Sequence, residues 1–446
     1  MAPGEYVNLQ KALRLNEPCA AAFVGAGGKT TSIFLLARAL KHPVVVTTTT
    51  HMGLWQMPWG DRWIVGMPDS GQLELMANGV SVITSAPDES EKVGGLSAKQ
   101  LDQLHGICQQ KGWSLLIEAD GAKQLPLKAP AEHEPVIPAW VDLVVVVAGL
   151  TGLGASCDNA HIHHADRFAS LSGLQPGERV GENHLLAVLR SSTGGLKNIP
   201  EHSRKVLFLN QADDERLASA GRRLADQLLP TYDAVMIARL ATENENAQVL
   251  YVCEPIASVI LAAGGSTRFG TPKLSLTWRG KSFIDNILDT ISRCTFSQAV
   301  LVLNNAHSQL INITRPSNLI TIINPNWQEG QASSIRLGVK SLPGEIGGVV
   351  FFLGDQPQIP ERLVQELISR HACTHAAVIA PFVDGRRGNP VLFDRSTFKD
   401  LEQLQGDLGG RAIFAKYPVE YVPWHDASIL LDVDTPEDYS RLLELE

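Results

Sequence analysis

Short apolar runs rich in β-branched residues recur through the first half of the chain. Runs of this kind are typical of strands buried on both faces of a parallel sheet. Segments with helical periodicity, such as Ala218–Leu229, lie between them. The strand candidates are Ala20–Val24, Val44–Thr48, Ser114–Ile117, Leu143–Val147 and Val206–Leu209. The pattern predicts an α/β domain with a mostly parallel sheet.

The second half of the chain repeats this pattern. Its strand candidates are Ala257–Ala262, Ala299–Leu303, Leu319–Ile323, Gly348–Leu353 and Ala376–Ile379. The stretch 241–247 (ATENENA) is polar and has no apolar face, so we expect the domain boundary near residues 241–255. The 446 residues are enough for two or three domains. We predict two α/β domains, residues 1–245 and residues 256–446.

Composition narrows the class of protein. The formal net charge of −9 and a pI of about 5.8 argue against a nucleic-acid partner. The six cysteines are scattered without a C-x-x-C pair, so they indicate neither a disulfide framework nor a zinc ribbon. No signal-peptide pattern is visible, and the longest apolar stretch, around Leu143–Leu150, is too short to span a bilayer. We expect a cytoplasmic protein with no membrane partner.

Each half opens with a strand, a glycine-rich loop and a helix-like segment, the usual start of a nucleotide-binding α/β unit. In the second half the loop reads Leu261-Ala-Ala-Gly-Gly-Ser-Thr-Arg-Phe-Gly-Thr-Pro-Lys273. Gly264 and Gly265 would let the backbone approach a ligand closely. Arg268 and Lys273 would add positive charge where a triphosphate lies.

This loop resembles the motif L-A-A-G-x-S-x-R-[MF]-G-x-x-K of the MobA-like nucleotidyltransferases, and most closely that of the molybdenum cofactor cytidylyltransferases. Further segments resemble the family's motifs in the same order. They are Asn324–Ser334 (NPNWQEGQASS), Gly354–Pro357 (GDQP), Gly385–Pro390 (GRRGNP) and Asp432–Asp438 (DVDTPED). The resemblance covers about residues 256–446. It departs from the family at Asn389, where histidine is common, and this puts the role of Asn389 in doubt.

The resemblance implies a Rossmann-like nucleotidyltransferase domain that uses Mg²⁺ and a nucleoside triphosphate. The resemblance favours CTP as this donor, and GTP is the alternative. It implies a nucleotide site formed by Leu261, Ala262, Ala263, Gly264, Gly265, Ser266, Arg268 and Lys273. It also implies acceptor contacts from Ser333, Ser334 and Asn389, and metal ligation by Asp355 and Asp434.

The residues themselves support such chemistry. Asp355 follows the apolar run Val349–Leu353, so it stands at the carboxyl end of a strand, where ligands gather in open α/β sheets. A carboxylate there can hold Mg²⁺ with few other protein ligands. A phosphate-monoester acceptor has a second pKa of about 6 and needs no general base near pH 7. Catalysis then consists of alignment and charge neutralisation by Arg268 and Lys273, with the metal on Asp355.

Each of these side chains also has a purely structural alternative. Asp355 could form an Asx-turn before Pro357. Asp434 could cap a helix that begins near Pro436, and the serines after Gly330 could be helix caps.

In the first half the loop reads Gly25-Ala-Gly-Gly-Lys-Thr-Thr31 and ends like a Walker A motif. Phe23 stands where the first glycine of G-x-x-x-x-G-K-[ST] would fall, so the loop is similar to the compact form of ATP-dependent ligases. Lys29 would reach the β/γ-phosphate oxygens and Thr30 would hold Mg²⁺. The remaining cradle residues are Gly25, Gly27, Gly28 and Thr31. A structural glycine turn is the alternative.

Two later strand ends extend this predicted P-loop NTPase site. Glu118-Ala-Asp-Gly121 places carboxylates after a strand, with Asp120 as a metal ligand in the manner of Walker B. Asn210-Gln-Ala-Asp213 looks like the N-K-x-D guanine-reading motif of GTPases, with Gln211 in place of lysine. Asp213 would then accept two hydrogen bonds from guanine; a plain strand-end turn is the alternative. We expect GTP or ATP here.

The segments Thr47–Met52 (TTTTHM) and Glu118–Pro138 resemble the YqeC family of selenium cofactor biosynthesis proteins, over about residues 15–240. This resemblance implies an accessory nucleotide-binding domain linked to selenium-dependent molybdenum hydroxylases. The segment His161–His164, with Asp158 and Asp166 nearby, is either a metal cluster or a solvated or phosphate-contacting loop.

Three functions remain open from the sequence. The first is a molybdopterin nucleotidyltransferase fused to a P-loop NTPase, with a molybdopterin-type acceptor and a molybdenum hydroxylase apoenzyme as partners. The second is a sugar- or alditol-phosphate nucleotidyltransferase, and the third is a nucleotide-binding chaperone that delivers a cofactor. The motifs after residue 324 favour the first over the second. The presence of Asp355 and Lys273 favours a catalytic function over that of a cofactor-delivering chaperone.

Overall fold

The computed structural model describes residues 7–89, 91–175, 177–240, 247–265, 269, 273–306, 317–407 and 409–445. The chain divides into two compact units, Met1–Cys253 and Glu254–Glu446. The first unit extends eight residues past the predicted end at 245, because residues 247–253 form a strand of its sheet. Part of the predicted polar boundary, 241–246, lies outside the described residues.

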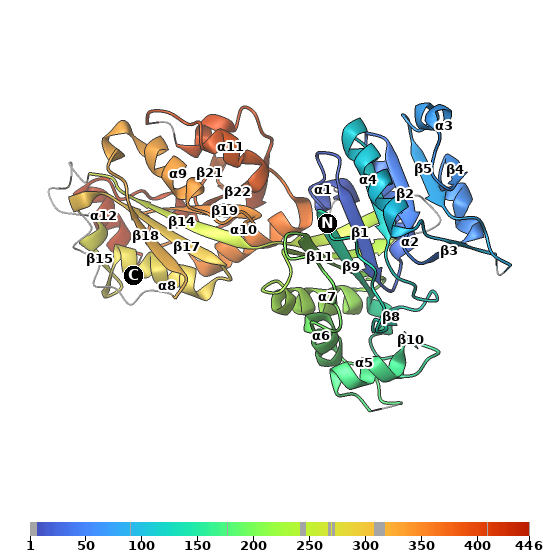
Figure 1. The fold of residues 1–446 in the computed structure, drawn as a ribbon. Coiled ribbons are helices and arrows are strands. Elements are labelled where there is room, and N and C mark those ends of the chain that lie inside the picture. The colour runs from blue at the N-terminus through green and yellow to red at the C-terminus, as the bar shows by residue number, and fades with distance from the viewer. Residues whose placement is uncertain are drawn as a thin grey trace. The chain divides into compact units, whose positions relative to one another are not determined.

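The first unit is built on a nine-stranded sheet in the order β13-β12-β11-β9-β1-β7-β2-β5-β4 (Figure 1). Neighbouring strands are parallel except at β13, which is antiparallel to β12. The strands are β1 (Ala20–Gly25), β2 (Val44–Thr48), β4 (Arg62–Val65), β5 (Val80–Thr84), β7 (Ser114–Glu118), β9 (Leu143–Gly149), β11 (Arg204–Asn210), β12 (Ala234–Leu240) and β13 (Ala247–Cys253). Two short pairs join β3 (His51–Gly53) to β6 (Lys92–Gly94) and β8 (Leu127–Lys128) to β10 (Ile162–His163).

Helices cover both faces of this sheet. They are α1 (Leu9–Ala12), α2 (Lys29–Ala39), α3 (Ser70–Leu75), α4 (Ala98–Lys111), α5 (Ala165–Ser172), α6 (Glu182–Arg190) and α7 (Glu215–Leu228). One core includes the apolar faces of α4 to α7, and the other includes α1 and α2. In α7, Asp214 caps the first turn, and Leu217, Leu224 and Leu228 recur at helical spacing and are buried. The strands predicted in this half are confirmed; β2 has the predicted bounds, and the others extend one or two residues further at one or both ends.

The second unit has an eight-stranded sheet in which β18, β17, β14 and β19 are parallel neighbours. Beyond β19, β22 is antiparallel, followed by β20, which pairs with β21 and β23. The strands are β14 (Ile256–Ala262), β17 (Gln298–Leu303), β18 (Leu319–Ile323), β19 (Gly348–Leu353), β20 (Val378–Val383), β21 (Arg386–Arg387), β22 (Val391–Asp394) and β23 (Val419–Pro423), and β15 (Thr277–Trp278) pairs with β16 (Lys281–Ser282). The strand predicted at Ala376–Ile379 begins two residues later, because His375 ends a helix in a left-handed conformation.

The helices of this unit form a layer on each side of the sheet (Figure 1). They are α8 (Phe283–Arg293), α9 (Gln331–Lys340), α10 (Glu361–Thr374), α11 (Phe398–Leu401) and α12 (Pro436–Leu443). One core packs α8 and α10 on the sheet, and the other packs α9 and α11. The two units are thus both α/β with mostly parallel sheets, as predicted. In the described part of the chain, no helix is both long and apolar enough for a transmembrane span.

Candidate functional site

A cleft of the second unit opens at the carboxyl ends of β14 and β19, with a volume of about 600 Å³. All of the predicted nucleotide and metal residues of this unit that the structure describes line it, and so does one of the predicted acceptor residues, Ser334. The nucleotide and metal residues are Leu261, Ala262, Ala263, Gly264, Gly265, Lys273, Asp355 and Asp434. Segments up to about 170 residues apart in sequence therefore meet at one sheet edge. Asp355 lies at this edge, just after β19, as its place behind the apolar run predicted. A cleft of this size holds a small molecule such as a nucleotide.

The first wall of the cleft is the glycine-rich loop after β14. Ala262 and Ala263 are buried, whereas Gly264 and Gly265 are exposed. The Asn304 side chain donates a hydrogen bond of 2.9 Å to the Ala263 carbonyl oxygen and braces the loop from β17. The predicted residues Ser266 and Arg268 lie outside the described residues, so their roles stay predictions.

Lys273 and two aspartates form the charged centre of the cleft. The Lys273 ammonium lies 2.5 Å from Asp434 Oδ1 and 3.9 Å from Asp355 Oδ2. Thr435, not Asp434, is the N-cap of α12, in a capping box with Asp438. The alternative that Asp434 caps this helix is therefore wrong. The side chain of Asp434 is directed to Lys273 instead.

Asp355 is the most perturbed group of the cleft. Its Oδ1 is buried and has no hydrogen-bond partner among the described residues, while 29% of its side chain is exposed. Burial, reinforced by the negative charge of Asp432, raises the pKa of Asp355 to about 6. Burial and the charge of Asp434 likewise raise the pKa of Asp432, whose carboxylate accepts a 2.6 Å hydrogen bond from Gln356. A carboxylate oxygen that is desolvated and unpaired is suited to a cation.

The two serines of the predicted acceptor site are held by Asn324. Its amide donates hydrogen bonds of 2.8 Å and 2.9 Å to the hydroxyl oxygens of Ser333 and Ser334. Gly330 is the N-cap of α9, so the alternative that these serines are helix caps is wrong. Ser334 lines the cleft, but Ser333 and Asn389 are not among its lining residues. Asn389 lies in the turn between β21 and β22.

Several lining residues were not predicted from the sequence. They are Leu274, Trp327, Gln328, Gly330, Gln331, Leu353, Gly354 and Asp407. Trp327 and Gly330 belong to the segment Asn324–Ser334 that already carried the resemblance, so that segment could have identified them. Asp407 lies in a polar loop with no motif of its own. It reaches the cleft because its carboxylate accepts a 3.3 Å hydrogen bond from the Gln331 backbone.

The second candidate site is the glycine loop between β1 and α2 in the first unit. Gly25 and Gly27 have positive φ values of 94° and 84°. A Cβ would lie 2.2 Å from the Val147 carbonyl oxygen at Gly25 and 2.4 Å from the Gly149 nitrogen at Gly27. Both positions therefore require glycine, because the loop presses against β9. Gly28 is the N-cap of α2, which begins at Lys29.

Lys29 is buried and folds back onto its own loop. Its ammonium lies 2.5 Å from the Gly25 carbonyl oxygen and 3.1 Å from Asp120 Oδ1. The hydroxyl of Thr30 donates a 2.7 Å hydrogen bond to Glu118, whose pKa burial raises. The structure thus brings the glycine loop and the predicted strand-end carboxylates together, but their roles in nucleotide and metal binding stay predictions.

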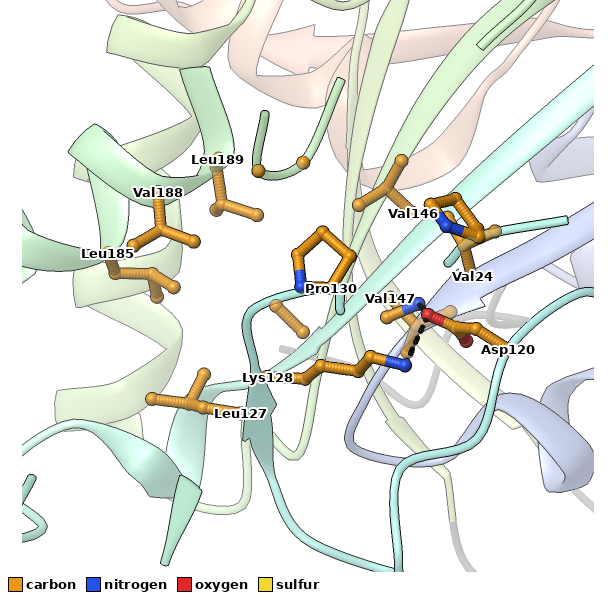
Figure 2. A pocket seen from close by; sticks show the side chains of 15 residues that line it. Val24, Asp120, Leu127, Lys128, Pro130, Val146, Val147, Leu185, Val188 and Leu189 are labelled. Carbon is orange, nitrogen blue, oxygen red and sulfur yellow. Dashed lines mark hydrogen bonds and ion pairs between the residues drawn. The ribbon is translucent and has the colours of Figure 1, made fainter. Parts of the chain in front are cut away.

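A second buried lysine, Lys128, joins this network, and sequence reasoning missed it. Its ammonium lies 2.9 Å from Asp120 and 2.7 Å from Glu134, and Figure 2 shows it directed at Asp120. Burial raises the pKa of Glu134, but the hydrogen bond and charge of Lys128 outweigh it, so the pKa lies below its ordinary value. The adjoining cavity of about 30 Å³ has room for water and not for a nucleotide. A lysine inside the apolar sequence LPLKAP was the available signal.

Asn210 and Asp213, which were predicted to read the base, have different surroundings in the structure. The side-chain amide of Asn210 donates a 2.7 Å hydrogen bond to the Gly27 carbonyl oxygen. The Oδ1 atom of Asn210 accepts a 3.3 Å hydrogen bond from the Leu240 backbone N–H. Asn210 thus braces the glycine loop. Asp213 is exposed, and no described contact ties it to that loop.

The side chains of the histidine segment make separate contacts. His164 Nε2 lies 3.9 Å from Glu134 Oε2. His161 and Asp158 are 2.7 Å apart, and the rings of His163 and His164 stack at 4.0 Å. Burial and the charge of His164 lower the pKa of His163 to about 4. Among the described residues, the only group of three metal-type ligands that converge lies elsewhere.

Comparison with known proteins identifies both units. The family model described as "YqeC protein" matches residues 21–166, and that of the "MobA-like NTP transferase domain" matches residues 258–421. The Uncharacterized protein YqeC of Escherichia coli is 36% identical over 200 residues, which are 44% of this chain and 76% of that protein. The chain therefore belongs to the YqeC family, through its first unit, and carries a MobA-like NTP transferase domain as its second.

Two further matches concern the second unit. The Molybdenum cofactor cytidylyltransferase of Escherichia coli is 26% identical over 189 residues, covering 41% of this chain and 93% of that protein. The crystal structure of Rv0371C from Mycobacterium tuberculosis in complex with manganese is 27% identical, with a TM-score of 0.37, and the match covers 43% of this chain and 98% of that chain. The family model and the sequence relatives make the second unit a nucleotidyltransferase.

Proposed function

We propose that the second unit transfers a nucleoside monophosphate, from CTP in preference to GTP, to a molybdopterin-type phosphate monoester. The observation that carries the proposal is the cleft in which the glycine loop, Lys273 and the unpaired Oδ1 of Asp355 meet. The 26% identity to a protein named molybdenum cofactor cytidylyltransferase supports the choice of donor and acceptor.

We propose Asp355 and Asp434 as the holders of Mg²⁺. The fit is supported by the orphaned Asp355 oxygen and by the two carboxylates that Lys273 bridges. An all-oxygen set with few protein ligands suits this ion, which keeps several waters and phosphate oxygens. The bound ion would neutralise charge on the triphosphate. Lys273, which is hydrogen-bonded to Asp434 and lies 3.9 Å from Asp355, would then be released to the phosphates.

In the proposed reaction an oxygen of the acceptor phosphate attacks the α-phosphorus of the triphosphate. The new bond joins that oxygen to the α-phosphorus, and the bond from the α-phosphorus to the bridging oxygen breaks, so pyrophosphate leaves with the electron pair. No proton has to move, because the acceptor is already ionised near pH 7. Lys273 and Arg268 stabilise the charge on the leaving pyrophosphate, and the backbone of Ala263–Gly265 positions the donor.

We further propose that the first unit is a P-loop nucleotide-binding accessory domain in the maturation of molybdenum hydroxylases, including selenium-dependent ones. Support comes from the glycine turn against β9, the buried Lys29 and the hydroxyl of Thr30 beside Glu118. A triphosphate would take over the contacts that Asp120 and the Gly25 carbonyl now make to Lys29. The alternative acceptors for the second unit are sugar or alditol phosphates.

The test is to incubate the full chain with each of the four nucleoside triphosphates, Mg²⁺ and molybdopterin, and to identify the product by mass spectrometry while measuring pyrophosphate. We expect a cytidylylated product, and no turnover with Asp355→Ala at unchanged circular dichroism. Glucose 1-phosphate and an alditol phosphate serve as competing acceptors. Turnover only with those acceptors would overturn the molybdopterin assignment, and full turnover by Asp355→Ala would overturn the metal assignment.

A further inference from the structure

Four buried side chains gather at the edge of the second unit's sheet that is opposite to the cleft. They are Glu254, His371, His375 and Asp394, and each side chain is at most 4% exposed. Asp394 pairs in register with Gly348, the first residue of β19, whereas Asp355 follows the last residue of that strand. Six strand residues separate the two ends, which corresponds to roughly 20 Å. The cluster is therefore distinct from the nucleotidyl-transfer site.

The geometry of the cluster suits a small cation. Ligand atoms of Glu254, His375 and Asp394 all lie within 4.8 Å of one another. His375 Nε2 and Glu254 Oε2 are 3.6 Å apart, close to the roughly 3.3–3.5 Å between two ligands of a tetrahedral zinc ion. His371 Nε2 lies 2.8 Å from Asp394 Oδ2. That contact is the kind of support that holds a metal-binding carboxylate in position.

The surrounding backbone fixes these side chains in place. The backbone N–H of Gly347 donates a 2.8 Å hydrogen bond to the carbonyl oxygen of Pro255, next to Glu254. The backbone N–H of Asp394 donates a 2.9 Å hydrogen bond to the carbonyl oxygen of Ala377. A Cβ at Gly347 would lie 2.5 Å from Glu254 Oε2, so this glycine makes room for the carboxylate. His375 ends α10 with φ 45° and ψ 37°, in a left-handed position that favours glycine or asparagine. A bulky residue in that conformation carries strain, which is common at functional positions.

The chemistry of the side chains indicates which ion would fit the cluster. Asp394 accepts a 2.8 Å hydrogen bond from the Ser396 backbone on Oδ1 and faces His371 with Oδ2, so its carboxylate is held rigidly in place. Two buried carboxylates beside an imidazole can be compensated by one divalent cation. Mixed imidazole and carboxylate ligands suit zinc and its neighbours rather than Mg²⁺ or Ca²⁺.

We propose that Glu254, His375 and Asp394 bind a divalent transition-metal ion, zinc in the first place, with His371 as the positioning residue for Asp394 and a water in the fourth place. The ion would join three separate segments: the start of the unit, the end of α10 and the end of β22. Its role is structural, because the site is buried and remote from the cleft.

The test begins with the full chain purified without chelator. Mass spectrometry of the metal content should give about one zinc per chain, and Co²⁺ added after chelation should bind in one equivalent with a visible absorption band. His375→Asn is the informative variant, because asparagine tolerates the left-handed position and preserves the helix end. We expect its zinc affinity to fall at least 100-fold, and that of His371→Asn by about 10- to 100-fold.

Two control variants make the result specific. His425→Asn removes an exposed histidine of the same unit, and Asp355→Asn alters the cleft; both should keep one zinc and the wild-type affinity. Wild-type protein that carries no zinc, binds no Co²⁺ and keeps its melting temperature when either is added would overturn the proposal in favour of direct contacts between the histidine and carboxylate side chains. Loss of the metal in Asp355→Asn, with retention in His375→Asn, would also overturn it.

Discussion

Asp355→Asn should stop nucleotide transfer and yet make the metal-free second unit more stable. The ionised Asp355 opposes folding, because its pKa in the folded protein is raised from 3.8 to about 6, by burial first and by Asp432 second. A pKa raised on folding means that the folded state binds the proton more tightly. The free-energy cost that the ionised Asp355 adds to folding is therefore absent below about pH 4, grows as the pH rises to about 6, and is complete at pH 7.

The magnitude follows from the same pKa. Each pKa unit corresponds to about 1.4 kcal/mol, so the rise from 3.8 to about 6 sets an upper limit of about 3 kcal/mol. With 29% of the side chain exposed, solvent screens part of this, and we expect about 1–2 kcal/mol. In a unit of this size that gain raises the melting temperature by about 3–6 °C.

The assay is scanning calorimetry of the full chain in EDTA at pH 4 and pH 7.5. The transition of the second unit is identified as the one that CTP with Mg²⁺ shifts in the wild type. Asp355→Asn should raise the temperature of this transition at pH 7.5 and leave it unchanged at pH 4. Added Mg²⁺ should raise it in the wild type alone. Glu345→Gln, at an exposed position, controls for a general charge effect. A variant that is no more stable at pH 7.5, or gains equally at both pH values, would refute the reasoning.

Three further predictions concern the first unit. Lys29→Ala should remove nucleotide binding by this unit in calorimetric titration and leave pyrophosphate release by the second largely unchanged; loss of both would mean that the two units share one site. Asp213→Asn should weaken GTP binding and narrow a GTP-over-ATP preference of roughly 1–3 kcal/mol, because guanine offers a donor pair that adenine lacks; equal affinities in the wild type would make Asp213 a turn residue. Lys128→Met should cost about 3–5 kcal/mol, because it leaves Glu134 buried without its lysine and Asp120 with Lys29 alone. Denaturant unfolding measures this cost, and a loss below about 1 kcal/mol would contradict it.

The strands were predictable because burial on both faces leaves a continuous apolar run, and β2 and β18 agree with the prediction residue for residue. The end of the first unit was not predictable from the sequence. Its last strand, β13, follows a polar stretch and belongs to the sheet because it pairs with β12. The local sequence pattern does not reveal this contact. Of the charged centre of the cleft, Asp355 was predictable from a strand end, whereas Lys273 was predicted from the glycine-rich loop and Asp434 from the resemblance. The contact of Asp407 with Gln331, that of Gln356 with Asp432 and the buried Lys128 depend on tertiary contacts between distant segments.

The pairing of each candidate site's lysine with an aspartate has a consequence for the binding equilibria. Lys273 lies against Asp434 in one unit and Lys29 against Asp120 in the other, so neither ammonium presents its full charge to a free triphosphate. A cation that takes over the aspartate releases the lysine at the same moment. Metal and nucleotide should then bind synergistically, each raising the apparent affinity for the other. Saturation curves for the nucleotide should shift to lower concentration as free Mg²⁺ rises, beyond what formation of the magnesium–nucleotide complex explains.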